Sequence, residues 1–248
     1  MQPWEHPVPT VLYKYMPPER VHVLSDCRVR FTQRNDFEDD HELQPDYAAF
    51  GNSDEIWRFV IRKGVKLNPR IQANVLVQWI AQTPKWQAAA KQTALKVVEK
   101  SVNELGVFCL TEAPNCERMW EGHANNGRGF AIAFDTAHTG FEQLKTPGRF
   151  GKVSYSDQPF GTVLGTLETE GFGALFRKRM KYGFEREWRG IRGLSRLELH
   201  QGSIFLSPFD PACVRAIVIG PACAVETELR QLVATDARYQ HVQIAVES

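Results

Sequence analysis

The sequence predicts an α+β fold: a single domain with a curved mixed or antiparallel sheet and an inserted helical hairpin. Two observations predict it. Short apolar or alternating segments occur in clusters, whereas a doubly wound parallel sheet would alternate strands and helices regularly. One long stretch, residues 54–105, has helical character and interrupts these strands. Because no Gly-, Ser- or Pro-rich linker divides the chain, we expect residues 1–248 to form one domain.

The N-terminal third begins with two expected strands. "VLYKY" (11–15) is a short strand, and "RVRFTQ" (28–33) alternates as a half-buried strand does. Pro17 and Pro18 open a helical turn between them. The polar residues 34–46 predict a loop.

The inserted hairpin is predicted from its caps and period. Thr83 before Pro84 is typical of a helix N-terminus with proline at the first helical position. Beyond it, apolar residues recur at helical spacing, a pattern that indicates packing: Trp86, Ala89, Ala90, Ala94, Val97, Val98 and Leu105.

After Leu105 the period changes to that of strands. The expected strands are 106–111, 127–135, 152–156, 185–191, 203–206, 214–220 and 241–246, and the expected helices are 113–126, 162–182 and 224–236. We expect 106–111, 127–135, 185–191 and 214–220 to be neighbours in one sheet.

Charge and cysteine content narrow the class of protein. Thirty Lys and Arg balance 29 Asp and Glu, so net charge does not indicate nucleic acid as a partner, although a local basic groove stays open. No run reaches the about 18 apolar residues of a membrane span, and the N-terminus lacks a signal-peptide pattern. Five cysteines without a CxxC pair favour a reducing compartment. We therefore expect a cytoplasmic protein with no membrane partner.

An acidic segment, "FEDDHE" (37–42), has the chemistry of a divalent-cation site. Acidic loops are usually solvated, and neighbouring loop residues often point apart. We therefore predict no metal site. A metal-dependent nuclease built on Glu38, Asp39, Asp40 and His41 is the least favoured function.

Two other segments carry candidate ligand-binding residues. Trp120 and His123 are three residues apart and share a helix face, followed by Asn126-Gly127 and Gly129, so they could hold a planar ligand. The alternative is a buried Trp with a capping His. In "EREWR" (185–189), two carboxylates and an arginine alternate, which puts them on one face of a strand as either a catalytic group or a solvated edge.

These segments resemble, in order, the motifs of a bacterial and phage-borne family of unknown function. Its members show "LYKY", "NDPFE", "CFS", "MWxxYAxxxxG" and "ExExR" motifs, and the matching segments are "LYKY" (12–15), "RNDFED" (34–39), "FCLTE" (108–112), "MWEGHANNGRGFAIAFD" (119–135) and "EREWR". The chain departs from the family twice: the proline of "NDPFE" is absent, and His123 replaces a tyrosine.

The layout of these motifs also resembles, distantly, the ADP-ribosyltransferase fold. This resemblance implies NAD as substrate and transfer of ADP-ribose to an unknown acceptor. It implies a carboxylate against the ribose, an arginine that orients the carboxylates or binds a phosphate, a dinucleotide-binding first strand and an aromatic pocket wall. On this resemblance, Glu187 or Glu185 would supply the carboxylate and Arg189 would be the arginine. Tyr13, Lys14 or Tyr15 would bind the dinucleotide, and Trp120 with His123 would form the pocket wall. A non-enzymatic sensor in phage response, binding a nucleotide or a partner, is the alternative.

Overall fold

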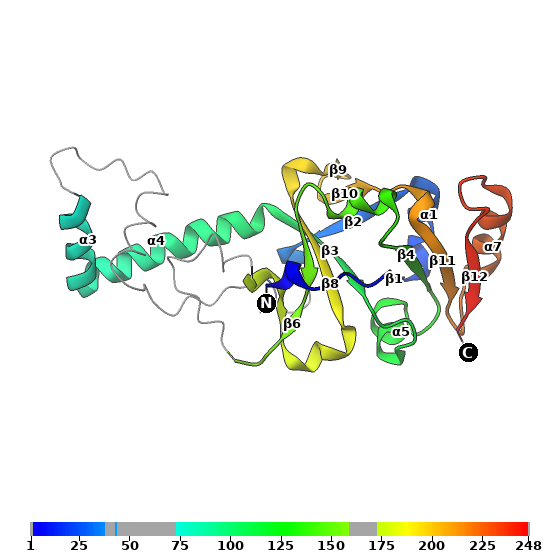
Figure 1. The fold of residues 1–248 in the computed structure, drawn as a ribbon, viewed down its shortest axis with the longest axis horizontal. Helices are drawn as coiled ribbons and strands as arrows, with labels where there is room; N and C mark the ends of the chain where they lie inside the picture. Colours follow the sequence, from blue (N-terminus) through cyan, green and yellow to red (C-terminus); the bar gives the residue numbers. More distant parts are fainter. Residues whose placement is uncertain (1, 38–42, 44–72, 159–172, 248) are drawn as a thin grey trace.

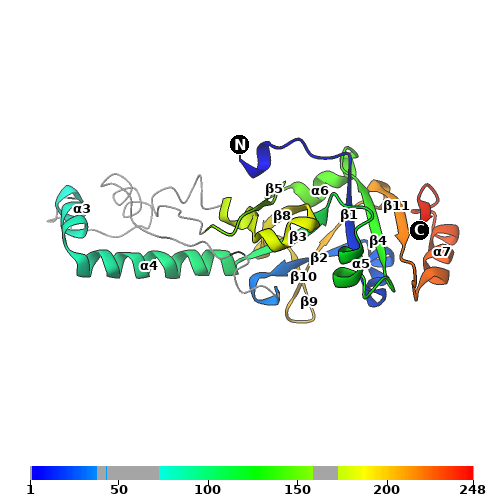
Figure 2. The same ribbon diagram turned by 90° about the horizontal axis from the view of Figure 1, so that it is seen from below.

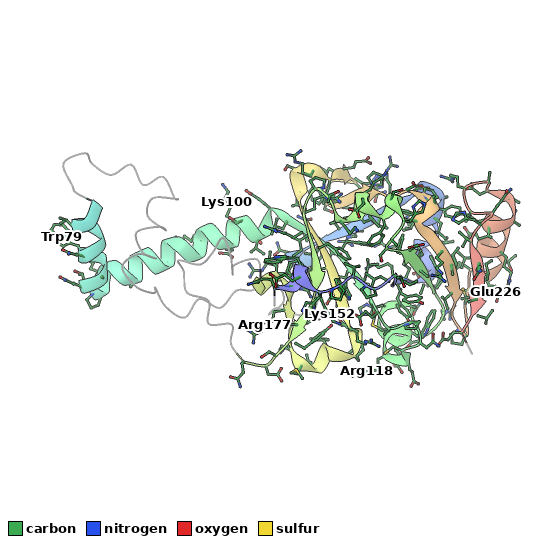
Figure 3. All side chains as sticks on the ribbon, in the orientation of Figure 1. Trp79, Lys100, Arg118, Lys152, Arg177 and Glu226 are labelled. Atoms are coloured by element: carbon green, nitrogen blue, oxygen red, sulfur yellow. The ribbon has the colours of Figure 1, made fainter. Side chains whose placement is uncertain are left out.

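The structure is a computed structural model that describes residues 2–37, 43, 73–158 and 173–247. It is an α+β fold, as the sequence predicts, with a sheet in the body and a helical arm projecting from it (Figures 1 and 2). The arm consists of α3 (Ala73–Gln82) and α4 (Pro84–Asn103), which confirms the helical character of this range, although α3 lies across the outer end of α4 and does not fold back along it as a hairpin would (Figures 1 and 2). Its expected first part, residues 54–72, lies outside the described residues.

Ten strands form one mixed sheet in the described part of the chain. Their order is β12-β11-β4-β1-β3-β2-β10-β9, with β8 on β3 and β5 on β8. The strands are β1 (Val11–Met16), β2 (Arg28–Gln33), β3 (Leu105–Thr111), β4 (Phe130–Asp135), β5 (Arg149–Lys152), β8 (Glu187–Gly193), β9 (Glu198–His200), β10 (Ile204–Pro208), β11 (Val214–Ile219) and β12 (Gln243–Val246). The four strands expected in one sheet all belong to it, with β1 between β3 and β4.

The two faces of this sheet are covered differently. Alternate residues of β1 point to opposite faces: Leu12 and Met16 join the large core, and Tyr15 joins a smaller one. The large core packs against α1 (His22–Asp26), α6 (Glu142–Lys145) and α7 (Glu226–Thr235). The smaller core lies under α5 (Glu117–His123). None of the described helices is both long and apolar enough to cross a membrane.

Three predicted elements differ in the structure. Residues 173–182 do not form an α-helix: they form the 3-10 helix η5 (Gly173–Phe176), the two-residue β7 (Arg177–Lys178) and the start of the 3-10 helix η6 (Met180–Glu185). The rest of that predicted helix, 162–172, lies outside the described residues. The strand expected at 152–156 is divided between β5 and β6 (Ser154–Tyr155).

The third difference concerns "EREWRGI". The strand starts at Glu187, because Arg186 has a left-handed backbone (φ 43°, ψ 50°) that no continuous strand accommodates. It is no solvated edge, since β8 pairs with β3 on one side and β5 on the other. The side chains of Glu187, Trp188 and Arg189 are accordingly buried.

The turn between α5 and β4 confirms the glycine interpretation. Asn126 and Gly127 both have positive φ, as does Asn125. At Gly129, a Cβ would stand 2.0 Å from the carbonyl oxygen of Met16 at the end of β1. Only glycine lets this chain pass so close to β1.

We expect Gly129→Ala to lower the free energy of unfolding by about 1–3 kcal/mol, because the added methyl group must displace backbone. The matched control is Gly122→Ala in α5, where a Cβ meets nothing within 4 Å. That change should be neutral or stabilise by up to about 1 kcal/mol, since alanine favours the helix. Urea denaturation measures both. An unchanged midpoint for Gly129→Ala would contradict the close approach.

Candidate functional site

The sheet forks at β3, and a cavity opens at the fork. On one side β3 pairs with β8 along its whole length. On the other side it meets two different strands: Thr111 pairs with Tyr13 of β1, while Val107 and Gly106 pair with β2. Residues 108–110 lie between these pairings, where β1 and β2 diverge. A sheet that divides in this way leaves a concave surface between its branches.

The cavity has a volume of about 370 Å³, within the range of small-molecule sites. Its walls come from β1, β2, β3, α5 and the segment before β8. The lining residues are Tyr13, Lys14, Tyr15, Thr32, Asp36, Phe37, Cys109, Leu110, Thr111, Arg118, Met119, Gly122, His123, Lys178, Tyr182, Phe184, Glu185 and Glu187. Most of the residues predicted for a ligand site, from three segments of the sequence, therefore share one cavity.

Two carboxylates form the buried wall of this cavity. Glu187 receives two hydrogen bonds from Arg189, from Nε to Oε1 at 2.7 Å and from Nη2 to Oε2 at 3.0 Å. Lys178 donates to Glu185 Oε2 at 2.7 Å and lies 3.5 Å from Glu187 Oε2. The two glutamates, at 5% and 3% exposure, are thus joined through Lys178.

The charge of Glu187 is fixed by its surroundings. Burial alone raises the pKa of its carboxyl, but the charges of Arg189 and Lys178 outweigh burial and hold that pKa well below the usual 4.5. The Arg189 guanidinium is fully buried beneath the cavity wall and also donates to the carbonyl of Leu175 at 2.7 Å. Arg189 therefore orients Glu187 and does not line the cavity.

Glu185 reaches the cavity from a different backbone position. It ends η6, and the left-handed Arg186 separates it from the strand. The Arg186 side chain lies on the other side, where Glu112 Oε2 accepts from its Nη2 at 2.9 Å. Glu112 also accepts from Trp188 Nε1 at 2.7 Å and Lys152 Nζ at 2.8 Å. This group holds the backbone turn that aims Glu185 at the cavity.

Helix α5 supplies the opposite wall. His123 is half-exposed, and its Nε2 lies 3.9 Å from Glu185 Oε1. Trp120 does not line the cavity; it is buried behind it, edge-on to Tyr15 with ring centroids 4.7 Å apart. The prediction that Trp120 walls the pocket is therefore wrong in detail, because the inner face of α5 packs on the sheet and only its outer edge reaches the cavity.

The first strand contributes unequally. The Tyr15 hydroxyl donates to the carbonyls of Ala113 and Pro114, at 3.0 Å and 2.5 Å, so it anchors the loop before α5. Tyr13 and Lys14 both line the cavity and are half-buried. Of the three predicted dinucleotide-binding residues, Tyr13 and Lys14 are therefore placed to contact a ligand.

Two cations besides the carboxylate-bound Lys178 lie on the cavity wall: Lys14, which the sequence predicts, and Arg118, which it does not. Arg118 of α5 stacks on Phe184, its guanidinium carbon 3.7 Å from the ring centroid. The Lys14 ammonium lies 5.5 Å above the Phe108 ring. Within the described residues neither cation has a carboxylate partner, whereas Asp36, Glu185 and Glu187 each have one. The wall therefore offers two cations, Arg118 and Lys14, that no described carboxylate neutralises.

The acidic loop cannot be assessed in the same way, since Glu38, Asp39, Asp40 and His41 lie outside the described residues. Among the residues that are described, no group of three or more His, Cys, Asp or Glu is arranged to hold a metal ion.

Comparison with known proteins adds no relative: no family model, no curated protein and no solved structure matches the chain. The resemblance to the bacterial and phage-borne family and the analogy to ADP-ribosyltransferases therefore stay predictions. Interpretation of the site depends on its geometry.

Glu187→Gln should lower the free energy of unfolding at pH 7 by about 3 kcal/mol or more, because it removes the carboxylate charge that binds the buried Arg189 guanidinium through two hydrogen bonds. The folded-state pKa of Glu187 lies below its unfolded value, so the stabilisation is present above about pH 4.5 and is lost as pH falls below it. The difference between variant and wild type should therefore be smaller at pH 3 than at pH 7, and it should keep shrinking as pH falls toward the folded-state pKa.

The control for this prediction is Glu226→Gln, which breaks an exposed i,i+4 pair with Arg230 on α7. It should change stability by less than about 0.5 kcal/mol at either pH. Urea titrations across pH measure both variants. A Glu187→Gln protein as stable as wild type at pH 7 would show that the buried pair is dispensable.

Proposed function

We propose that the chain binds NAD in the forked-sheet cavity and transfers its ADP-ribose group to an acceptor. The observation that carries the proposal is the Glu185 carboxylate: it is buried in the cavity wall, bound by Lys178 through one oxygen, and faces His123 and the cavity with the other. A carboxylate in such a position matches a reaction that develops positive charge on a sugar.

The chemistry assigns a role to each wall. Cleavage of the bond between nicotinamide nitrogen and ribose C1′ sends the bonding electron pair to nicotinamide and leaves cation-like charge on the ribose. Glu185 would accept a hydrogen bond from the ribose 2′-hydroxyl and stabilise that charge. The acceptor then attacks C1′, and its proton passes to His123 at the cavity edge. Lys178 and Glu187 hold Glu185 in place.

The two cations that have no carboxylate partner among the described residues support a phosphate-bearing substrate. A guanidinium stacked on an aromatic ring keeps its in-plane N–H groups free, and these match phosphate oxygens as a bidentate donor. Arg118 on Phe184 has this arrangement, and Lys14 adds a second positive charge from β1. NAD combines a diphosphate with a cationic nicotinamide, so it complements a cavity with the cations Arg118 and Lys14 on one part of its wall and carboxylates on another.

A binding module without catalysis is the second candidate function. The specific observation in its favour is that both glutamates are paired with protein cations, Glu185 with Lys178 and Glu187 with Arg189. A sensor of nucleotides needs such a cavity but no free carboxylate. Saturable NAD binding without release of nicotinamide would select this function.

Glu185→Gln keeps the shape of the side chain and its hydrogen bond from Lys178 but removes the charge opposite the ribose. We expect nicotinamide release to fall by about a hundredfold, with NAD affinity changed little, because the contact strengthens mainly in the transition state. Chromatographic measurement of free nicotinamide gives the rate. The matched control is Glu121→Gln, an exposed glutamate of α5 outside the cavity. Equal rates in wild type and Glu185→Gln would exclude this role.

Arg118→Gln tests the phosphate contact separately. We expect NAD affinity to fall by about tenfold or more, the scale of one charged hydrogen-bonding contact, with kcat for nicotinamide release nearly unchanged. Arg128→Gln, at an exposed arginine outside the cavity, is the control. Calorimetric titration at two salt concentrations also checks the charge dependence, which should be weaker in the Arg118 variant. A variant that binds like wild type would place the phosphates elsewhere.

A further inference from the structure

A second cavity lies on the same sheet face, next to the first. Its volume is about 540 Å³, and it is formed over β1, β4, β11 and β12 beside the loop that leads into α5. Tyr13 lines both cavities. One side chain thus separates the site of the proposed reaction from this second cavity, and a ligand longer than one cavity can extend past it.

The floor of the second cavity is flat and apolar. Ala133 of β4 lies opposite Ala216 of β11, and Val218 lies opposite Ala245 of β12. These short side chains keep the sheet surface low where α5 no longer covers it. Since neighbouring strands lie about 4.8 Å apart, three strands give a surface about 10 Å wide, enough for a purine ring lying flat.

A β-bulge brings a charge to this apolar floor. Val214 pairs with Phe134 and Ala216 pairs with Ala133, so Arg215 is an extra residue of β11 with no partner of its own on β4. In a regular strand the residue beside Ala216 would point to the opposite face, into the large core. The bulge instead lets Arg215 line the cavity, exposed and without a carboxylate partner among the described residues. Bulges that redirect a side chain are common beside functional sites.

We propose that the second cavity binds the adenosine half of the dinucleotide, with the base on the Ala133–Ala216 floor and Arg215 contacting the phosphate or the base. This inference rests on the proposed NAD site and extends it. The diphosphate then passes Tyr13, whose hydroxyl is free of hydrogen bonds within the described residues and is available to it. Glu247 on the rim offers an acceptor for the exocyclic amine of adenine.

The test compares three ligands by isothermal titration calorimetry: NAD, nicotinamide mononucleotide and AMP. All chains carry Glu185→Gln, so NAD stays intact during the titration. Ala216→Phe fills the floor of the second cavity and is separated from the first by Tyr13. We expect it to weaken binding of NAD and AMP by about tenfold or more and to leave nicotinamide mononucleotide binding unchanged. Arg215→Gln should weaken NAD and AMP binding in the same direction.

The matched control is Ala234→Phe, at an exposed alanine of α7 outside both cavities, which should bind all three ligands normally. If Ala216→Phe fails to fold, as circular dichroism would show, Arg215→Gln at the surface decides the matter alone. Unchanged NAD and AMP affinities in the variants would overturn the inference. Equal affinities for NAD and nicotinamide mononucleotide in the chain that carries only Glu185→Gln would also overturn it.

Nicotinamide release by the wild-type chain separates this inference from the proposed function. Release of nicotinamide with no effect of either variant on affinity means that the transfer reaction stands and the second cavity is empty of ligand. AMP binding that the variants abolish, without nicotinamide release, means that the second cavity is assigned correctly and the reaction is wrong. A chain that binds none of the three ligands overturns both.

Discussion

The buried ion pair between Glu187 and Arg189 is the interaction on which the site depends. Two charges in the middle of a sheet, between β3 and β5, are tolerated only when each is paired and hydrogen-bonded. Arg189 satisfies a further donor with the Leu175 carbonyl, which requires residues 173–178 to cross this face of the sheet. That crossing brings Lys178 to the two glutamates. The segment that covers the site is therefore held in place by the same arginine that orients Glu187.

A second constraint acts from the opposite side of the β3–β8 pair. Glu112 accepts from Trp188, Lys152 and Arg186, and these three donors outweigh the effect of its burial and keep its pKa below the usual value. The Arg186 bond supports a left-handed residue that is not glycine, a conformation that costs free energy by itself. Because of this turn, Glu185 and Glu187 face one cavity although only Glu187 belongs to the strand. Strained backbone conformations occur most often at functional sites, and the turn at Arg186 fits that pattern.

The sequence predicted the helices and strands that local pattern determines, and it failed where tertiary contacts determine the backbone conformation. The strands 11–16, 28–33 and 214–219 and the helix after Thr83 follow from apolar period and proline position, although the Thr83 side chain makes no capping hydrogen bond. The failure at 173–182 has a tertiary cause, since Arg189 binds the Leu175 carbonyl and β7 pairs with β6, which leaves only 3-10 segments on either side of β7. The start of β8 was missed for the same reason: nothing in "EREWR" signals a left-handed arginine.

The same distinction between local and tertiary contacts explains which residues of the candidate site the sequence predicted. The motif segments brought Tyr13, His123, Glu185 and Glu187 into one cavity, because each lies at the end or edge of an element that the pattern located. Lys178 escaped prediction because its partners are seven and nine residues away along the chain, a spacing set by the 3-10 segment η6 and by no α-helical period. Arg118 lines the cavity and Trp120 does not, for a geometric reason. Residues 118, 119, 122 and 123 share the face of α5 toward the cavity, and Trp120 lies on the side that packs against Tyr15.

Strand β1 connects these observations, because its alternating residues serve three different surroundings. Tyr15 is fixed by two carbonyls of the loop before α5, and Leu12 belongs to the large core. Tyr13 has neither constraint: it lies at the last pairing before the fork, with Thr111 on one side and Ala133 on the other. The fork opens one cavity beside it and the small residues of β4 and β11 leave the other. A single tyrosine therefore borders both cavities as a consequence of sheet topology, and any ligand that spans them must pass it.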